Sequence, residues 1–432
     1  MKVTAIVGLN ASGKTQYVEQ MRRRLASDKV RYIAFRDSYG VATDQAYYLQ
    51  LRWNQHDIDA ETPTAGQLLE RAFSMTGDDT TERRAWQHHL YDLFDMKSLL
   101  DKYVITLSSG ELRKFQLAKT LLTRPSTLIM DAPFIGLDSE ARSQLNQLLE
   151  ILAREQNMEL YLVVASPRDI PPFTTDVVTI GSMDEGEGPG LSDEKRNAII
   201  AMSNPADNHQ DGAVIDCRKV SIRYGERTIL KDLDWRVNRG EHWVLSGQNG
   251  SGKSTLLSLV CADNPQGYAC DITLFGHQRG SGESIWELKR HIGYVSPEMH
   301  RSYQRDLPAV RIVASGLKDT VGLYVRATEE ELQVCRRWMD VFGIAHLADR
   351  SFLRMSSGEQ RLVLLARAFV KDPELLILDE PLHGLDDVNR RLVKDVIEAF
   401  CQRPEKTLIF VSHYKEERPK CIDHEIYLTY SK

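Results

Sequence analysis

The chain carries one set of short motifs twice, and this repeat constrains its fold more than any other feature of the sequence. A glycine-rich octapeptide, Gly-x-Asn-x-Ser-Gly-Lys-Thr/Ser, begins at Gly8 and returns at Gly247. Three later motifs (Ser-Ser-Gly-Glu, an apolar run ending in Asp, and Gly-Leu-Asp) each return after 248 residues. A motif order that occurs twice predicts two units of one architecture, and we expect domains at residues 1–183 and 213–432.

The segment between the two copies, residues 184–212, has the composition of a connector. Its first residues are acidic residues, glycines and a proline, and the segment shows little apolar periodicity. This composition is typical of flexible linkers. We therefore expect a linker here, with room for one short helix around residues 195–202.

The overall composition fits a globular protein and excludes several classes. Charged residues make up 27% and hydrophobic residues 42% of the 432, which excludes a largely disordered chain. No run of 18 apolar residues occurs and the first ten residues lack a secretory pattern, so we expect neither a membrane span nor export. The six cysteines lack closely spaced pairs and are interpreted as reduced thiols, not as a disulfide framework or zinc site. These features predict a cytoplasmic protein, and the net charge of −6 disfavours nucleic acid as a partner.

The two glycine-rich loops are the first candidates for a binding site. The first follows the apolar run at residues 3–7 and precedes apolar residues at helical spacing, which is the strand–loop–helix context of a phosphate-binding loop. Glycines let backbone N–H groups approach phosphate oxygens, and the helix N-terminus adds a favourable charge. The lysines would neutralise β- and γ-phosphates, and Thr15 and Ser254 would hold Mg²⁺. The expected nucleotide-binding residues are Gly8, Leu9, Asn10, Ala11, Ser12, Gly13, Lys14 and Thr15 in the first copy and Gly247, Gln248, Asn249, Gly250, Ser251, Gly252, Lys253, Ser254 and Thr255 in the second.

The Ser-Ser-Gly-Glu motif predicts the start of a helix in each copy. Ser108 with Glu111, and Ser356 with Glu359, have the spacing of a capping box. Such a helix start presents serine hydroxyls and backbone N–H groups. An apolar strand ending in aspartate follows some 20 residues later in both copies.

This motif order resembles that of the ATP-binding cassette (ABC) ATPase family, over nearly the whole chain and in both copies. Residues 267–296 are similar in particular to the ModF/PhrA-type tandem ABC proteins, which are assigned to molybdate transport or photorepair. The resemblance implies an α/β fold with two tandem P-loop NTPase domains. Each would have a mostly parallel sheet and a helical subdomain that carries the Ser-Ser-Gly-Glu signature. We expect an antiparallel β layer, from about residue 213 to 237, only in the second.

The resemblance also implies where ATP and Mg²⁺ bind. In this family two cassettes pack head to tail, and each ATP lies between the phosphate loop of one and the signature of the other. Ser108, Ser109 and Gly110 would therefore complete the site on the second loop. Ser356, Ser357 and Gly358 would complete the site on the first loop. Tyr224 would stack on adenine, and Asp131 and Asp379 would lie at the strand ends, with Asp379 holding Mg²⁺. Glu380 would orient or deprotonate the attacking water, His413 would contact the γ-phosphate, and Lys253 would stabilise charge.

The two copies differ at the positions that hydrolysis needs. Ala132 follows Asp131 where Glu380 follows Asp379, and Pro167 is expected to end the strand that His413 ends in the second copy. Gly8 also has only seven residues before it, so the first copy lacks an adenine-stacking strand unless the true start lies upstream. We therefore predict one competent and one degenerate site. The alternative is that another carboxylate, such as Asp169, substitutes.

One departure from the family concerns coupling to a membrane subunit. Transporter cassettes usually carry a glutamine after the strand equivalent to residues 292–296, but Pro297-Glu298 stands here and Asp37-Ser38 at about the matching place in the first copy. This departure leaves ATP binding intact.

Two classes of function remain open. In the first, the chain is the ATPase component of a molybdate-type importer, held at the cytoplasmic face of the membrane by separate permease subunits. In the second, it is a soluble ABC ATPase that acts in regulation, DNA photorepair or translation. The acidic, glycine-bearing linker disfavours ribosome binding, and Glu380 with His413 disfavours a binding module without catalysis.

Overall fold

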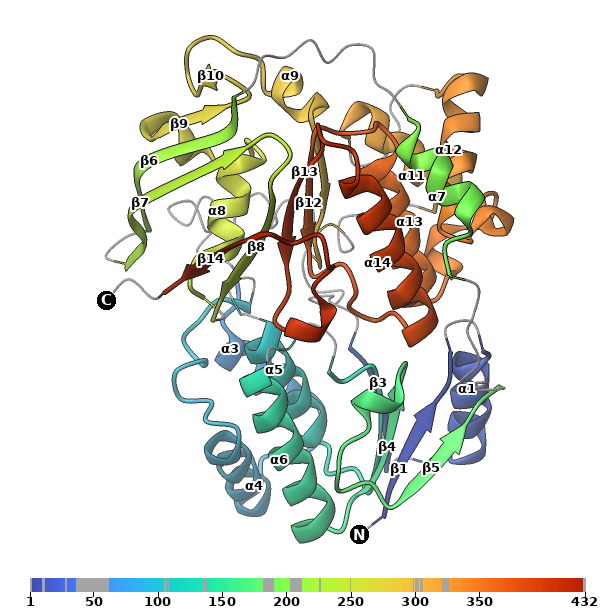
Figure 1. The fold of residues 1–432 in the computed structure, drawn as a ribbon. Coiled ribbons are helices and arrows are strands. Elements are labelled where there is room, and N and C mark those ends of the chain that lie inside the picture. The colour runs from blue at the N-terminus through green and yellow to red at the C-terminus, as the bar shows by residue number, and fades with distance from the viewer. Residues whose placement is uncertain are drawn as a thin grey trace. The chain divides into compact units, whose positions relative to one another are not determined.

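The protein is described by a computed structural model in which the chain divides into two compact units, Met1–Glu185 and Gly186–Lys432 (Figure 1). Among the helices of the described residues, none is long and apolar enough to cross a membrane. The residues described are 2–9, 12–27, 29–35, 62–104, 107, 109–134, 137, 139–181, 190–202, 212–224, 227–248, 250–297, 299, 303, 306–320 and 326–429.

The first unit is built on a parallel sheet with strand order β2-β3-β4-β1-β5. The central strands are short, nearly continuous apolar runs, which is expected where a parallel sheet is covered on both faces. In β3, Leu128 and Met130 belong to one hydrophobic cluster and Ile129 to another, so alternate residues face opposite sides of the sheet. The strands are β1 (Lys2–Val7), β2 (Val30–Ala34), β3 (Thr127–Asp131), β4 (Glu159–Val164) and β5 (Asp176–Thr179).

The helices of the first unit divide between the sheet and a helical subdomain. On the sheet lie α1 (Lys14–Arg24) and α6 (Ser139–Glu155). The subdomain comprises α3 (Ala65–Met75), α4 (Thr81–Leu93) and α5 (Ser109–Leu121), and the indole N–H of Trp86 on α4 donates to the carbonyl of Leu121 at 2.9 Å. The predicted helical subdomain with the signature at its α5 start is therefore present.

The second unit repeats this architecture with the equivalent strand order, β11-β12-β13-β8-β14. The strands are β8 (His242–Gly247), β11 (Ile292–Val295), β12 (Leu375–Asp379), β13 (Thr407–Val411) and β14 (His424–Leu428). The helices are α8 (Lys253–Val260), α9 (Ile285–Arg290), α11 (Ala309–Ala314), α12 (Glu329–Val341), α13 (Ser357–Phe369) and α14 (Asp387–Cys401). The repeated motifs therefore correspond to two sheets of one topology, as predicted.

The second unit adds a four-stranded antiparallel sheet in the order β10-β9-β6-β7. Its strands are β6 (Ala213–Tyr224), β7 (Arg227–Asn238), β9 (Asp271–Leu274) and β10 (His277–Gln278). Helix α8 is packed between this layer and the parallel sheet, since all three contribute to one hydrophobic cluster (Figure 1). The described residues of the first unit form no antiparallel sheet, which confirms the predicted difference between the copies.

The short helix for which the sequence left room, around residues 195–202, is present and packs on the second unit. Helix α7 (Asp193–Ile200) is capped by Ser192 and packs on α14. Ile199 is fully buried in the core of the second unit, and the Lys195 ammonium lies 2.9 Å from the Asp340 carboxylate. Residues 190–202 therefore belong to the second unit, although residues 184–189 have the acidic, glycine-rich composition of a linker.

Candidate active site

The two phosphate loops end in glycines that have the same backbone conformation. Gly13 and Gly252, which cap α1 and α8, have φ values of 92° and 98°, in the left-handed region that favours glycine. At the other end of the second loop, a Cβ on Gly247 would lie 2.6 Å from the carbonyl oxygen of Leu428. These positions therefore require glycine for the loop to close tightly over the helix N-terminus.

Each loop holds its lysine and leaves a buried hydroxyl for another group. The Lys253 ammonium donates to the carbonyls of Gly247 at 2.6 Å and Gln248 at 3.0 Å, and Lys14 donates in the same way to Gly8 and Leu9. The hydroxyls of Ser12 and Ser251 are buried and form no hydrogen bond within the described part of the chain. A cationic ammonium, unpartnered hydroxyls and a helix N-terminus fit the phosphates of a nucleotide.

The residues expected to hold Mg²⁺ are Thr15, Ser254 and Asp379. Thr15 and Ser254 are exposed at the first turns of α1 and α8, and Asp379 ends β12 half-buried, as Asp131 ends β3. Hydroxyl and carboxylate oxygens are ligands that Mg²⁺ prefers. Thr255, by contrast, is buried in α8.

Glu380 lies between two histidines at the end of β12. Its carboxylate oxygens are 2.5 Å from His383 Nε2 and 3.1 Å from His413 Nε2, and the residue is 6% exposed. Burial alone would raise the pKa of this carboxyl, but the positive charges of His383, His413 and Lys253 outweigh burial and hold the pKa below its ordinary value. Burial lowers the pKa of His383, but Glu380 more than compensates, so that pKa is raised. The arrangement therefore keeps Glu380 ionised and able to accept a proton.

The backbone of Glu380 is fixed from two sides. Its φ is 53° and its N–H donates to the carbonyl of Val411 at 3.0 Å. The buried guanidinium of Arg361, on α13, donates to the carbonyls of Asp379, Glu380 and Pro381. Arg361 and His383 were not predicted from the sequence. An arginine at the same place in both copies, Arg113 and Arg361, was the available signal.

In the first unit, Ala132 stands where Glu380 stands in the second. Its φ is 55° and its N–H donates to the carbonyl of Val163 at 2.9 Å, the same hydrogen bond that Glu380 makes to Val411. Beside it, the carboxylate of Asp131 accepts a hydrogen bond from the Tyr32 hydroxyl at 3.0 Å. The expected correspondence between Ala132 and Glu380 is therefore confirmed.

The expected match between Pro167 and His413 is wrong by two residues. Asp131 pairs with Val163 as Asp379 pairs with Val411, so the residue of the first unit that is equivalent to His413 is Ala165. Pro167 instead opens a 3₁₀ turn, Pro167–Asp169, which matches the turn Lys415–Glu417. A strand end is not marked in the sequence, and the apolar run gave no reason to place it two residues earlier. Alanine, like proline, has no side-chain hydrogen-bond donor.

Asp169, the alternative carboxylate, belongs to an ion pair that both units have. It accepts from the Arg142 guanidinium at 2.8 Å, and the matching pair in the second unit is Arg390 with Glu417 at 3.8 Å. Asp169 therefore occupies the place of Glu417, not the place of Glu380.

The signature helices begin where the sequence predicts. Ser356 caps α13, and a capping box joins it to Glu359: the Glu359 N–H donates to Ser356 at 3.3 Å and the Ser356 N–H to Glu359 at 2.7 Å. Ser357 and Gly358 form the first turn of α13, as Ser109 and Gly110 form that of α5. Several residues of interest lie outside the described residues, namely Asn10, Ala11, Asp37, Ser38, Ser108, Asn249 and Glu298, as does the side chain of Ser109.

Strands β2 and β11 are equivalent, and it is after this strand that transporter cassettes usually carry a glutamine. Val30 pairs with Thr127 as Ile292 pairs with Leu375, so the residue matched to Pro297 is Phe35, two residues before the expected Asp37. Phe35 is buried, and its N–H donates to the carbonyl of Asp131 at 3.0 Å.

The antiparallel layer covers the second loop and carries Tyr224. Tyr224 ends β6, half-buried, and its hydroxyl accepts from the Asn264 amide at 3.1 Å. A Cβ on Gly252 would lie 2.9 Å from Leu230 of β7, whereas a Cβ on Gly13 would meet nothing within 4 Å. The second loop therefore has a covering strand that the first loop lacks among the described residues.

Two sheets that each place a lysine-bearing glycine loop and an aspartate at their carboxyl edge define a tandem P-loop NTPase. A profile of the family described as ABC transporter matches residues 1–135 and 230–383, more than half of the chain. The chain belongs to the ABC transporter family, and with it to the enzymes that hydrolyse ATP.

Relatives support the tandem organisation. The ABC transporter ATP-binding protein ModF of Escherichia coli strain K12 is 35% identical over 98% of this chain and 90% of its own length. An uncharacterised ABC transporter ATP-binding protein of Schizosaccharomyces pombe is 28% identical over 95% of this chain and 81% of its own. The solved structure of an RNase-L inhibitor covers 99% of this chain and 83% of its own with a TM-score of 0.51, and at 17% identity it shows the fold alone.

Proposed function

We propose that the chain binds two ATP molecules with Mg²⁺ and hydrolyses mainly the one on the second phosphate loop. The observation that carries the proposal is the difference at two matched positions: Glu380 and His413 in the second unit, Ala132 and Ala165 in the first. In this proposal the signature residues Ser108, Ser109 and Gly110 complete the hydrolytic site, as the family arrangement implies.

At the second loop each residue has a separate task. Lys253 neutralises the β- and γ-phosphates and His413 contacts the γ-phosphate. Glu380 takes the proton of the attacking water as the new P–O bond forms and the bond from the γ-phosphorus to the bridging oxygen breaks, which leaves ADP and phosphate. Ser254 and Asp379 would hold Mg²⁺, which offsets the charge of the phosphates.

At the first loop, Lys14, Thr15 and Asp131 remain, with Ser356, Ser357 and Gly358 as the partner signature. These groups suit binding. Loss of a general base typically costs about 10²–10⁴ in rate, so ATP held there turns over slowly. The first site is in this proposal mainly structural.

The test is steady-state ATPase activity of Glu380→Gln beside Ala132→Gln. The two substitutions introduce the same side chain at matched backbone positions. We expect Glu380→Gln to lower kcat by at least about 100-fold and Ala132→Gln to leave it within about twofold. If Glu380→Gln keeps most of the activity, the assignment of the competent site is wrong. Binding of labelled ATP by both variants controls for folding.

We further propose that this ATPase serves an import system of the molybdate type through separate permease subunits. The similarity of residues 267–296 to the molybdate-type group supports it, as does a relative that carries the name of a transporter ATP-binding protein. Co-purification from native membrane extract is the test. Recovery of a membrane permease supports the proposal, and recovery of only soluble partners or nucleic acid would instead favour a regulatory or repair ATPase.

A further inference from the structure

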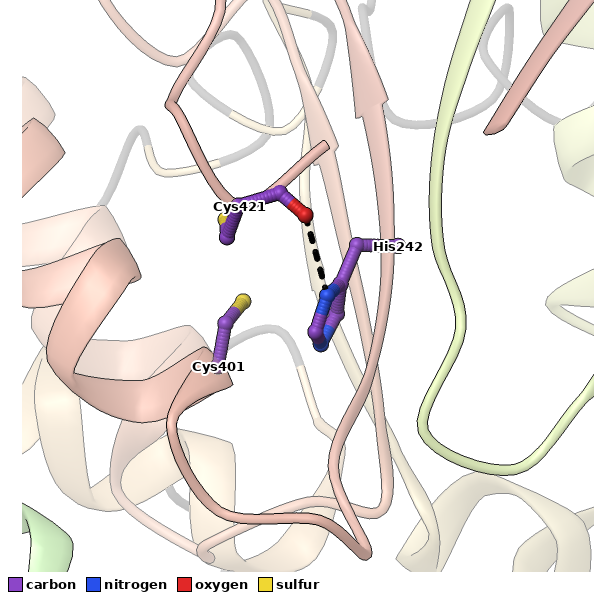
Figure 2. A group of neighbouring side chains, drawn as sticks. All are labelled: His242, Cys401 and Cys421. Atoms are coloured by element: carbon purple, nitrogen blue, oxygen red, sulfur yellow. Dashed lines mark hydrogen bonds between the residues drawn. The ribbon is translucent and has the colours of Figure 1, made fainter. Parts of the chain in front are cut away.

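Three potential metal ligands from distant parts of the sequence meet in the second unit. His242 begins β8, Cys401 ends α14, and Cys421 lies in the loop that leads into β14. One ligand atom of each lies within 4.8 Å of the other two. Figure 2 shows the Cys401 thiol and the His242 ring turned toward a shared space, with Cys421 beside them. The cluster stands where strands of the sheet begin, at the edge opposite the phosphate loop.

The hydrogen bonding of His242 leaves one ring nitrogen available. Its Nδ1 is 3.1 Å from the carbonyl oxygen of Cys421 (Figure 2), and because a carbonyl only accepts, Nδ1 carries the hydrogen. In the neutral ring Nε2 then carries a lone pair. Nε2 is buried and has no hydrogen-bond partner within the described part of the chain. A metal-bound histidine typically donates its other N–H to a backbone carbonyl in this way.

The two thiols are soft donors in a largely dry setting. Cys401 is 7% exposed and Cys421 is half-buried. Burial raises the pKa of the Cys401 thiol well above its usual range, and its hydrogen bond with Cys421 raises it further. The free Cys401 thiol therefore resists losing its proton, whereas a coordinated metal ion displaces the proton of a thiol ligand.

The first unit shows that the fold does not need polar groups at this corner. Strand pairing and helix register match His242 with Val3, Cys401 with Ala153, and Cys421 with Phe173. These three residues are all buried in one hydrophobic cluster of the first unit. The second unit therefore places an imidazole and two thiols where an apolar core satisfies the same architecture.

We propose that His242, Cys401 and Cys421 bind one Zn²⁺ ion that fastens the start of β14 to β8 and α14. Thiolate and imidazole donors suit zinc, and three protein ligands leave a fourth position for water. Tetrahedral zinc places ligand atoms about 3.6–3.8 Å apart, so the three side chains would draw together when the ion binds. Because Leu428 of β14 lies against Gly247, this clamp supports the strand on which the phosphate loop rests.

The test uses the reduced full chain, stripped of metal by a chelator and dialysed, with excess Mg²⁺ present to occupy oxygen-donor sites. Zinc is titrated against a competing chelator dye, and Co²⁺ is added separately as a spectroscopic probe. We expect one equivalent of zinc and a thiolate-to-cobalt charge-transfer band. Both should be lost in Cys401→Ser and in His242→Gln. Cys270→Ser, which changes a half-buried cysteine outside the cluster, is the matched control and should retain both.

A second readout separates coordination from a loss of folding. Zinc should protect Cys421 from alkylation in the wild type and in Cys270→Ser, as measured by mass spectrometry. It should also raise the melting temperature of these two proteins but not of Cys401→Ser. A reduced wild-type protein that takes no zinc, zinc that persists undiminished in Cys401→Ser, or formation of a Cys401–Cys421 disulfide in place of metal binding would each overturn the proposal.

Discussion

His383 should set the acid limit of ATP hydrolysis through its charge on Glu380. The two side chains are 2.5 Å apart in a buried setting, and burial pushes the pKa of the carboxyl upward while His383, His413 and Lys253 push it down. In the wild type the balance lowers the pKa, so Glu380 stays ionised until the pH falls well into the acid range. Replacing His383 with glutamine keeps a hydrogen-bond donor but removes the charge, so the effect of burial is opposed less.

The expected size follows from the geometry. An opposite charge within about 4–6 Å typically lowers a carboxyl pKa by 1–3 units, so the acid limb of kcat/KM in His383→Gln should move up by about one pH unit or more. The rate at pH 8 should stay close to that of the wild type, because Glu380 is ionised there in both proteins.

The assay is kcat/KM for ATP from about pH 3.5, below the ordinary range of a glutamate, to about pH 9. His346→Gln is the control for an exposed histidine in the same unit. An acid limb that coincides in wild type and His383→Gln would refute the reasoning. A uniform loss of rate at every pH would also refute it, because it would mean that His383 acts by position and not by charge.

Two further predictions concern the stability of the second unit, each measured by hydrogen exchange of peptides from each unit. Gly252→Ala should destabilise its loop more than Gly13→Ala. Both substitutions introduce a Cβ at positive φ, but only the Cβ at residue 252 would lie 2.9 Å from Leu230. Overpacking of this kind costs about 1–3 kcal/mol. Equal effects would contradict the role of the covering strand. Asp372→Asn should destabilise β12 and β13 by about 3–5 kcal/mol, because its carboxylate partners the buried cations of Arg403 and Lys406, the latter 0% exposed. A loss below about 1 kcal/mol would show that the neutral amide and nearby groups suffice.

Local sequence signals predicted the parts of the site that lie on one stretch of chain. The glycine loops, the capping box at Ser356 and Glu359, and the alternation of β6 depend on residues a few positions apart, and the structure has all of them. The repeat then extended each prediction to the other copy. This is why the two sheets and the place of Ala132 were predictable.

Features that depend on register or on distant residues were not predictable. The apolar run before Pro167 does not show where its strand ends, so the equivalent of His413 was predicted two positions too late, at Pro167 and not at Ala165. The role of Arg361, on α13, depends on its hydrogen bond to a backbone carbonyl at the end of β12. His242, Cys401 and Cys421 are far apart in the sequence, and they meet only in the folded second unit.

The left-handed residue after β3 has a consequence for how the first unit could change. A non-glycine residue at positive φ costs about 1–2 kcal/mol, and Ala132 bears that cost at 55° although it has no carboxylate to aim. The turn thus keeps the backbone conformation that Glu380 has in the second unit, although its side chain has no carboxylate. A glutamate at 132 and a histidine at 165 would enter a turn already shaped for them. On the proposed function, the catalytic turn of the first unit therefore differs from that of the second at these two side chains and not in its backbone.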